Sequence, residues 1–364
     1  MHRRTCGGET VAVSSSPLQD YLKPVPTPPG VTSRDIVRRA IEFEGPPRIP
    51  YSFLEPLESD FVELAAVIEG RADISRVPAG EMVFDEWGVG RRSSGTAWGN
   101  AEVHPLHDLG ALDSYRFPDV TRRERFAAAE ALARAGDEAG KYVVGPDLIL
   151  GIERLRLLVG FSDLMVALYT DRPRVERLLD RLVDMTLDVV QTYADMGTVH
   201  GFMTWEDWGL QTTLQIRPEQ WREIFKPRYA RIVEATHAAG MHYIFHCCGQ
   251  ISAIIPDLIE IGMDVLQLDQ PRLMGVERLA GEFGGKICFW NTVDIQWSAR
   301  PEVSLDEVRA EVGRMVEAFG RFNGGFIARQ YPQPRDIGMP PEKHRAIYEA
   351  FMEFGCGLGR EASR

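Results

Sequence analysis

The chain is poor in cysteine and has no long apolar run. Its five cysteines are an odd, sparse set in 364 residues, unlike the dense, even set of a disulfide-stapled secreted domain. No stretch reaches about 18 uninterrupted apolar residues, the length that a membrane-spanning helix needs. The first residues are basic, but no apolar core of a signal peptide follows them. We therefore expect a cytoplasmic protein that does not enter the membrane.

Positive charge is also in short supply. The chain has 41 Lys and Arg against 53 Asp and Glu, which gives a net charge of -12 and a pI near 5.3. Proteins that bind nucleic acid or an anionic membrane surface normally need a basic face. We expect neither partner, although net charge does not describe the charge of a single cleft.

The pattern of apolar residues predicts an α/β fold. Residues 1–30 are rich in Ser, Pro and Gly and predict an N-terminal arm, and residues 31–364 are expected to form one domain. In that domain, short and nearly continuous apolar runs alternate with segments of helical periodicity, which is typical of a (β/α)8 barrel. The predicted strands are residues 48–54, 82–89, 142–148, 200–208, 242–248, 264–269, 287–294 and 324–329.

Polar side chains recur at one end of these predicted strands. Active sites of (β/α)8 barrels lie at the C-terminal ends of the strands, so these residues are candidates for the site. They are Asp85, Glu86, Asp147, Glu206, Asp207, His246, Cys248, Asp269, Asn291, Asp294 and Arg329. Residues 90–105, rich in Gly and Ser, predict an inserted β-hairpin that serves as a lid or a pocket wall.

Several segments resemble the uroporphyrinogen decarboxylase superfamily. The segment HCCGQISAIIPDLIEIGMDVL is similar to the family's core, in which a strand ends in a His-x-Cys-Gly-like turn before a helix. Similar blocks are TSRDIVRRAIEFEGPPRIP, EDWGLQ, GEFGGKICFWNTVD with Gln296, NGGFIA and MPPEKHRAIYEAF. The resemblance covers about residues 31–357 and implies the same barrel.

The superfamily includes two chemistries. One is cofactor-free decarboxylation of porphyrinogens, and the other is zinc-dependent methyl transfer linked to corrinoids. The decarboxylases carry an Arg-Gln-Ala-Gly-Arg-like element after the first strand, whose arginines hold the substrate carboxylates. The corresponding segment here, PYSFLEPLESDF, has three acidic residues and no arginine, and such a segment would repel a substrate with eight carboxylates. The resemblance therefore favours the methyltransferase branch.

In the methyltransferases a His-x-Cys pair binds zinc, and the resemblance transfers this role to His246 and Cys248. Residues i and i+2 at a strand end point to the same side, so both side chains can reach one metal ion. A catalytic zinc keeps one position open, at which it can activate a thiol.

The third ligand departs from the family pattern. The methyltransferases often supply a late Cys after the final strand, but FIARQYPQPRDIG has none and Cys356 lies too far along the chain. We expect a carboxylate instead. Glu206 is the first choice, Asp207 is the alternative, and Asp269 is a weaker candidate.

The predicted function is transfer of a methyl group between a small methylated compound, or a thiol, and a corrinoid. The implied partners are zinc and a corrinoid protein or a free cobamide, and a homodimer is common among relatives. The predicted catalytic residues are Glu206, Asp207 and His246, with whichever carboxylate is not a ligand acting as general acid. The expected substrate contacts are Asp85, Trp205, Gln211, Asp269, Trp290, Arg329 and Tyr331.

Two other functions stay open from sequence alone. One is a metal-independent decarboxylase that acts on a porphyrinogen or another electron-rich ring. The other is a barrel that has lost catalysis and acts as a binding protein, with its acidic residues paired to arginines. In that case Asp85 and Glu86 would pair with Arg91 or Arg92, and Glu206 or Asp207 would pair with Arg329 or cap the next turn.

Overall fold

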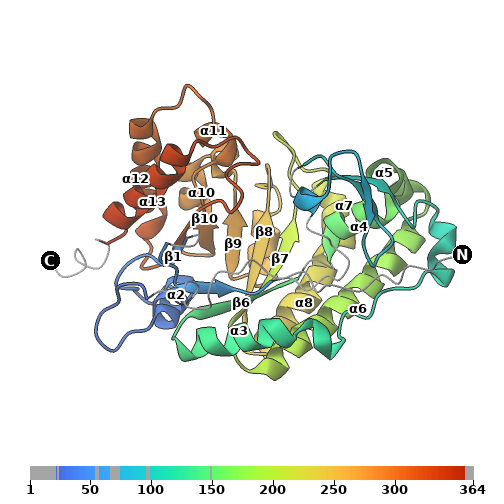
Figure 1. Cartoon of the computed structure of the whole chain (residues 1–364), viewed down its shortest axis with the longest axis horizontal. Coiled ribbons are helices and arrows are strands. Elements are labelled where there is room, and N and C mark those ends of the chain that lie inside the picture. Colours follow the sequence, from blue (N-terminus) through green and yellow to red (C-terminus); the bar gives the residue numbers. More distant parts are fainter. Residues whose placement is uncertain are drawn as a thin grey trace, which may run out of the picture.

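Eight parallel strands form a barrel surrounded by helices (Figure 1). The computed structural model describes residues 22, 24–53, 57–65, 74–95, 99–147 and 150–356, so residues 1–21 and 23 of the predicted arm lie outside the described residues. The (β/α)8 barrel expected from the sequence is confirmed. In spatial order the strands are β1 (Tyr51–Ser52), β11 (Phe326–Arg329), β10 (Cys288–Asn291), β9 (Val265–Leu268), β8 (His242–Cys247), β7 (Gly201–Glu206), β6 (Tyr142–Asp147) and β2 (Phe61–Glu63).

The helices lie outside the strands and alternate with most of them along the chain (Figure 1). The first, α2 (Ser33–Ile41), begins at a capping box formed by Thr32 and Asp35, and it packs Val37 and Ile41 against the barrel interior. The others are α3 (Ala127–Glu138), α4 (Gly151–Val159), α5 (Phe161–Thr170), α6 (Arg172–Met196), α7 (Pro218–Ile224), α8 (Lys226–Ala238), α9 (Ile255–Glu260), α10 (Val276–Phe283), α11 (Ile295–Ser298), α12 (Leu305–Gly320) and α13 (Pro341–Phe354).

Asp60 joins the two edge strands, β1 and β2. Its backbone N–H donates to the carbonyl of Tyr51 at 2.7 Å, and its carboxylate accepts the Tyr51 N–H at 2.8 Å. Arg48 donates to both oxygens of the same carboxylate, at 2.7 and 2.8 Å. Because both charged side chains are buried, an ion pair holds the barrel together at this seam.

Alternate residues of each strand point into the barrel, as the two-residue period of a strand requires. Phe61 and Trp290 stack there with ring centroids 4.6 Å apart, together with Met203 and Ile244 of neighbouring strands. The residues between them point outward and form a larger cluster beneath the helices. The interior of the barrel is thus a packed core, and a site must lie above it.

The predicted second strand, residues 82–89, is wrong. The second strand of the barrel is β2, which has three residues. Residues Met82–Phe84 form β3 of a separate antiparallel sheet, with β4 (Gly90–Arg92) and β5 (Asn100–Val103). The predicted hairpin is present as β4 and β5, and the inserted sheet lies beside α4 and α5 (Figure 1).

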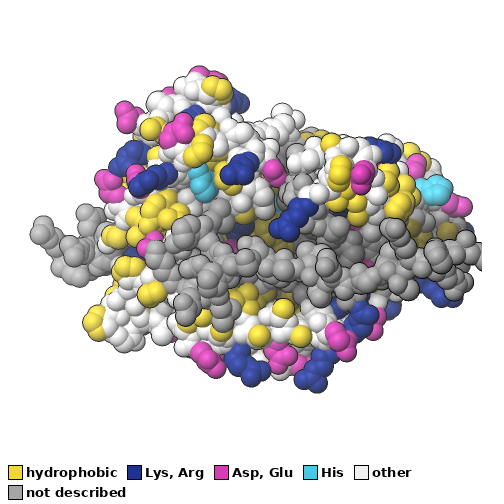
Figure 2. Space-filling model, in the orientation of Figure 1, with side chains coloured by type: hydrophobic (Ala, Val, Ile, Leu, Met, Phe, Trp, Pro, Cys, Tyr) yellow, Lys and Arg dark blue, Asp and Glu magenta, His cyan; other side chains and the backbone are white. Residues whose placement is uncertain are grey.

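Charge is mixed on the face of the molecule in Figure 2. Acidic and basic side chains are interspersed there, and hydrophobic side chains gather over the region of α5. The large exposed hydrophobic residues of α5 are Phe161, Val166 and Tyr169. Among the described residues, no helix is long and apolar enough to cross a membrane.

Candidate functional site

Strand alternation decides which polar residues point into the barrel at its C-terminal rim. β7 and β8 lie side by side, with Trp205 opposite His246 and Glu206 opposite Cys247. Residues directly opposite each other share one face of a sheet. Trp205 and His246 therefore point inward, whereas Glu206 and Cys247 point toward the helices.

Asp207, His246 and Cys248 form a group, here called the ligand group, that can hold a metal ion. One possible ligand atom from each residue lies within 4.8 Å of the other two. Nε2 of His246 is 3.6 Å from Sγ of Cys248 and 3.8 Å from Oδ1 of Asp207. Bonds of about 2.0–2.3 Å around a tetrahedral zinc place ligand atoms roughly 3.3–3.6 Å apart. The two separations that involve His246 are therefore within a few tenths of an ångström of those around a zinc ion.

Gln267 of β9 orients the imidazole of His246. Nδ1–H of His246 donates to Oε1 of Gln267, whose amide donates to Oδ1 of Asp269 at 2.8 Å. This leaves the lone pair of Nε2 directed at the ligand group. Metal-binding histidines commonly use the second ring nitrogen in this way.

The electrostatics of the ligand group suit a cation. Burial raises the pKa of the Cys248 thiol well above its usual value, and the charges of Asp207 and Asp269 raise it further. A divalent ion reverses this balance, because it takes the place of the thiol proton. Imidazole, thiolate and carboxylate together are a donor set that catalytic zinc accepts with one position open. The residues present therefore fit zinc.

Glu206 lies next to the ligand group but contacts the helices. Its Oε1 accepts the hydroxyl of Tyr229 in α8 at 2.7 Å, and its Oε2 accepts the N–H of Ile152 in α4 at 3.1 Å. Gly151 leaves room for the carboxyl group, since a Cβ there would lie 1.5 Å from Oε1. The structure thus brings Asp207, the alternative third ligand, into the ligand group in place of Glu206.

The pKa of Glu206 lies well above its usual value. The main cause is burial, which penalises the charged form, and the charges of Glu153 and Asp207 add to it. The hydrogen bond from Tyr229 acts in the opposite direction but does not outweigh burial. Burial therefore favours the protonated form of Glu206.

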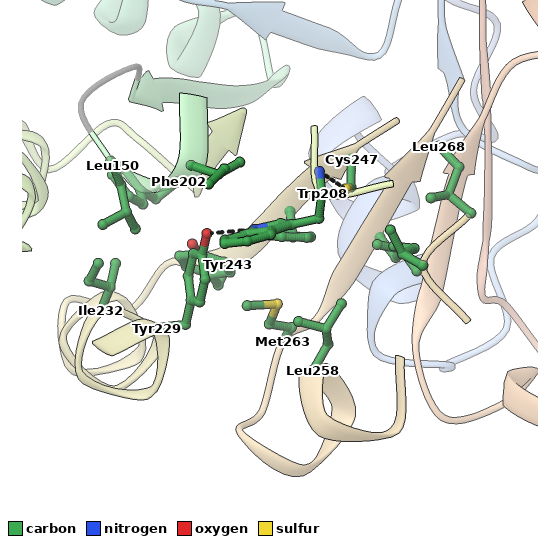
Figure 3. Packing of buried hydrophobic residues seen from close by; sticks show 14 of the residues in the cluster. Leu150, Phe202, Trp208, Tyr229, Ile232, Tyr243, Cys247, Leu258, Met263 and Leu268 are labelled. Atoms are coloured by element: carbon green, nitrogen blue, oxygen red, sulfur yellow. Dashed lines mark hydrogen bonds between the residues drawn. The ribbon is translucent and has the colours of Figure 1, made fainter. Parts of the chain in front are cut away.

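Cys247 and Trp208 belong to the buried hydrophobic cluster beneath the helices (Figure 3). The backbone N–H of Trp208 donates to Sγ of Cys247 at 3.2 Å, and its indole N–H donates to the Tyr229 hydroxyl at 3.0 Å. Cys247 points away from the pocket, as the alternation predicts, and belongs to the buried core.

The turns that carry Asp207 and Cys248 cross each other at two glycines. The N–H of Gly209 donates to the carbonyl of Cys248 at 3.1 Å. Gly249 has a φ of +81°, and a Cβ on it would lie 2.2 Å from the carbonyl oxygen of Gly209. Only glycine permits this approach, which fixes the two ligand-bearing turns against each other.

A cavity of about 770 Å³ lies at the C-terminal rim and includes the ligand group. The sequence-predicted residues that line it are Asp85, Trp205, Glu206, Asp207, His246, Cys248, Asp269 and Tyr331. Three other expected substrate contacts do not line it. Gln211 is exposed in a loop, Trp290 belongs to the barrel interior, and Arg329 is buried with its guanidinium 5.1 Å from the Trp290 ring and 3.4 Å from Glu63.

Asp85 and Glu86, near the inserted sheet, have other partners than the sequence predicted. Asp85 caps a turn, where its Oδ1 accepts the N–H groups of Trp87 and Val89, both at 3.0 Å. Glu86 pairs with Arg125, and Arg92 pairs with Glu102. The predicted pairing of the two acidic residues with Arg91 or Arg92 is therefore wrong for Glu86, and Asp85 acts as a cap.

Sequence reasoning missed one wall of the cavity. Glu153, Arg154 and Arg156 line it from the first turns of α4, and Arg91 lines it from β4. The sequence held a signal for these residues, because α4 follows β6. In a barrel, the loops and the first turns of the helices that follow the strands surround the active site. Strand ends alone do not reveal residues that lie on a helix.

Comparisons with known proteins agree with this architecture. The sequence model of the family Uroporphyrinogen decarboxylase (URO-D) matches residues 155–330. The comparison with curated proteins gives no match. A methyltransferase from Methanosarcina mazei has a similar structure, with 15% identity and a TM-score of 0.56 over 88% of this chain and 85% of that chain. A glycosylated endo-β-1,4-xylanase from Gloeophyllum trabeum has 10% identity and a TM-score of 0.40 over 62% of this chain and 80% of that chain.

At that identity, the similarity to the methyltransferase establishes the barrel fold alone. The matched segment, residues 155–330, runs from α4 to β11 and includes all three residues of the ligand group. The barrel, the His-x-Cys-Gly turn and the family match agree. The sequence model of the uroporphyrinogen decarboxylase family thus matches the part of the barrel that carries the ligand group.

Proposed function

We propose that the chain is a methyltransferase that moves a methyl group between a small methylated compound, or a thiol, and a corrinoid, with zinc at the ligand group. The observation that carries this proposal is the convergence of Asp207, His246 and Cys248 within 4.8 Å on the cavity surface. The fold that this chain shares with a protein named as a methyltransferase also supports the proposed activity. A corrinoid protein or a free cobamide is the exchange partner in this proposal.

Asp207, His246 and Cys248 would hold the zinc, and Gln267 keeps Nε2 of His246 directed at it. When bound, zinc supplies a Lewis acid that activates a thiol or polarises the heteroatom that carries the methyl group. Trp205 packs against the imidazole, with ring centroids 4.6 Å apart, and limits its rotation. This chain therefore contributes a pre-oriented set of donors.

Glu206 is the proton donor in this proposal. A heteroatom that loses a methyl group without its bonding electrons keeps the electron pair and needs a proton. Burial favours the protonated form of Glu206, which lines the cavity and follows Trp205 on β7. An acid positioned this way contributes typically about 10²–10⁴-fold to a rate.

Metal content gives the first test. Protein purified without chelator should hold about one equivalent of zinc, measured by elemental mass spectrometry. Asp207→Asn, His246→Ala and Cys248→Ser should each lose most of it. Glu206→Gln is the matched control, because it changes the neighbouring carboxyl group and should keep the zinc. Wild-type protein without stoichiometric metal, or full retention in all three variants, would refute the ligand group.

Methyl transfer gives the second test. Zinc-loaded protein is mixed with chemically reduced cobalamin and a panel of methylated ethers, amines and thioethers, and methylcobalamin is followed by its absorbance. Cys248→Ser should abolish transfer, and Glu206→Gln should slow it by about 10²-fold or more at unchanged zinc content. Transfer that proceeds equally in both variants contradicts the roles assigned here.

A second candidate, a metal-independent decarboxylase, is favoured by one observation. Arg91, Arg154 and Arg156 line the cavity, and arginines can hold substrate carboxylates. This function predicts release of carbon dioxide from a porphyrinogen-like substrate and no effect of chelators. The ligand group, in which burial raises the pKa of the Cys248 thiol, has no part in such a reaction.

A further inference from the structure

Three arginines on one wall of the cavity, here called the arginine wall, are not used by the mechanism above. Arg91 reaches the cavity from β4, and Arg154 and Arg156 reach it from α4. The Nε atoms of Arg91 and Arg156 are buried without a hydrogen-bond partner among the residues that the structure describes. A buried donor without an acceptor loses its hydrogen bonds to water, and this loss is larger when the group is charged.

The charges on this wall are unevenly compensated. Glu153 pairs with Arg156, and Asp85 already accepts two backbone N–H groups. Burial lowers the pKa of Arg154 to about 10, and the charges of Asp85 and Asp147 act in the opposite direction, so Arg154 stays charged near neutral pH. Arg154 and Arg156 thus have acidic neighbours of their own.

Arg91 is the least compensated of the three. Its Nε is buried without a partner, and no hydrogen bond or ion pair joins its side chain to another residue in the described part of the chain. Burial lowers its pKa, and the charge of Arg156 acts in the same direction, while the charges of Asp85 and Glu153 oppose it. A guanidinium that is partly desolvated and lacks an acceptor is a ready partner for an anion.

The other acidic residues of the cavity form contacts elsewhere. Glu63 pairs with Arg329, and Asp269 accepts the amide of Gln267. Glu206 accepts hydrogen bonds from α8 and α4, and Asp207 belongs to the ligand group. The guanidinium of Arg91 is therefore left for a ligand.

We propose that Arg91 binds a carboxylate of the substrate, so that the methylated compound handled here is a small carboxylic acid with an apolar body. The planar fork of a guanidinium matches a carboxylate in two parallel hydrogen bonds. Leu157, Phe161, Met203 and Trp205 line the same cavity and provide apolar surface for the body of such a molecule. The assignment of the methyl group rests on the proposed function, whereas the carboxylate subsite does not depend on the metal.

Binding of matched anionic and neutral probes tests the subsite. The probes are 4-methoxybenzoate and hexanoate, each compared with its neutral amide by calorimetric titration into the full chain, once zinc-loaded and once treated with chelator. The carboxylates should bind at least about 10-fold more tightly than their amides in both states, because charge-assisted hydrogen bonds are about twice as strong as neutral ones. Equal affinity for acid and amide, or no binding of either carboxylate, would overturn the subsite.

Arg91→Met and Arg92→Met form a matched pair of variants. Arg92 is the next residue on β4, but it pairs with Glu102 on the exposed surface. Arg91→Met should weaken carboxylate binding by about 10- to 100-fold, as expected for loss of hydrogen bonds to a charged group, and Arg92→Met should leave it unchanged. Equal effects of the two variants would overturn the assignment to Arg91. Should Arg91→Met fail to fold, the acid–amide comparison in the wild-type chain still decides.

The outcomes also separate this inference from the proposed function. If the chain holds no stoichiometric zinc but binds carboxylates through Arg91, the carboxylate subsite stands and the zinc methyltransferase is refuted. If the chain holds stoichiometric zinc but shows no preference for carboxylates, the subsite is refuted and the zinc methyltransferase stands.

Discussion

The orientation of His246 depends on one buried amide, Gln267. Its side chain has no exposed surface, and it joins Nδ1 of His246 to Asp269 through two hydrogen bonds. Such a chain selects one tautomer of the imidazole and holds the ring plane. The ligand group is therefore set by β9 as well as by β7 and β8.

Gln267→Leu should weaken zinc binding by about 10- to 100-fold, the usual effect of losing the partner of a metal-binding histidine. The leucine fills a similar volume but accepts no hydrogen bond, so the imidazole can rotate and change tautomer. Competition with a coloured chelator measures the affinity, and circular dichroism verifies the fold. An unchanged affinity would mean that packing against Trp205 alone holds the ring.

A second histidine, His200, makes stability depend on pH. Its Nδ1 accepts the backbone N–H of Val143 at 2.9 Å, so protonation at Nδ1 breaks a hydrogen bond. Burial and the nearby charge of Arg34 lower the pKa of His200 to about 4, although Asp137 opposes the shift. The unfolded chain, with a histidine pKa of about 6.5, then binds the proton more readily than the folded chain does.

The contribution of His200 to the free energy of unfolding should therefore be complete above pH 6.5. It should be lost between pH 6.5 and 4, which lowers the free energy of unfolding by about 3 kcal/mol. His200→Asn keeps an acceptor near Nδ1 but does not titrate, so its stability should fall less across this range. Urea unfolding at pH 7 and pH 4.5 measures the difference. The exposed His107, replaced by Asn, is the control and should follow the wild type.

The choice between Glu206 and Asp207 marks the limit of sequence reasoning at the residue scale. The sequence places both carboxylates at the end of one strand, beside the His-x-Cys pair. Which of them points inward depends on the register of β7 against β8, and that register pairs Glu206 with Cys247. Cys247 lies between His246 and Cys248, so strand alternation turns it outward. Aligning Glu206 with Cys247 would have placed Asp207 inward.

At the scale of elements, the site depends on the crossing of two turns. Gly209 follows β7, Gly249 follows β8, and their backbones approach more closely than any side chain permits. The turns carry Asp207 and Cys248, so the crossing sets the separation of two of the three proposed ligands.

Gly249→Ala should remove zinc binding and destabilise the fold, because its Cβ would lie 2.2 Å from the Gly209 carbonyl oxygen. The matched control is Gly240→Ala, which has a similar φ of +73° but nothing within 4 Å of the new Cβ. The control should cost only the left-handed strain, about 1–2 kcal/mol, and keep its zinc. Chemical unfolding and metal analysis are measured on both. Equal zinc contents would show that the crossing can relax without harm to the site.

Seven of the eight barrel strands lie within the predicted segments, and only β2 was missed. Strands such as β7 and β8 have six residues, nearly all buried, and stand out as continuous runs. β2 has only three residues, and its position depends on pairing with β6, which is a tertiary contact. The segment 82–89 was wrongly predicted as a barrel strand because its apolar residues have another role. Trp87 and Val89 are buried in the inserted region, whereas Phe84 of the same segment is 55% exposed.

At the scale of the whole molecule, closing the barrel requires its two edge strands to meet. β1 and β2 are the shortest of the eight, with two and three residues, so few backbone hydrogen bonds can join them. The buried pair of Arg48 and Asp60 supplies that connection, with side chains 8% and 0% exposed. The seam lies among the first strands of the chain, whereas the ligand group lies across the barrel on β7 and β8.

Asp60→Asn should destabilise the whole barrel by about 3–5 kcal/mol, because it leaves the Arg48 charge buried without its counter-ion. Glu102→Gln breaks the exposed pair with Arg92 and should cost no more than about 1 kcal/mol. Denaturant unfolding followed by tryptophan fluorescence compares the two. Since the seam is distant from the site, folded Asp60→Asn protein should still bind one zinc. A loss no larger than that of Glu102→Gln would mean that packing, and not the ion pair, closes the barrel.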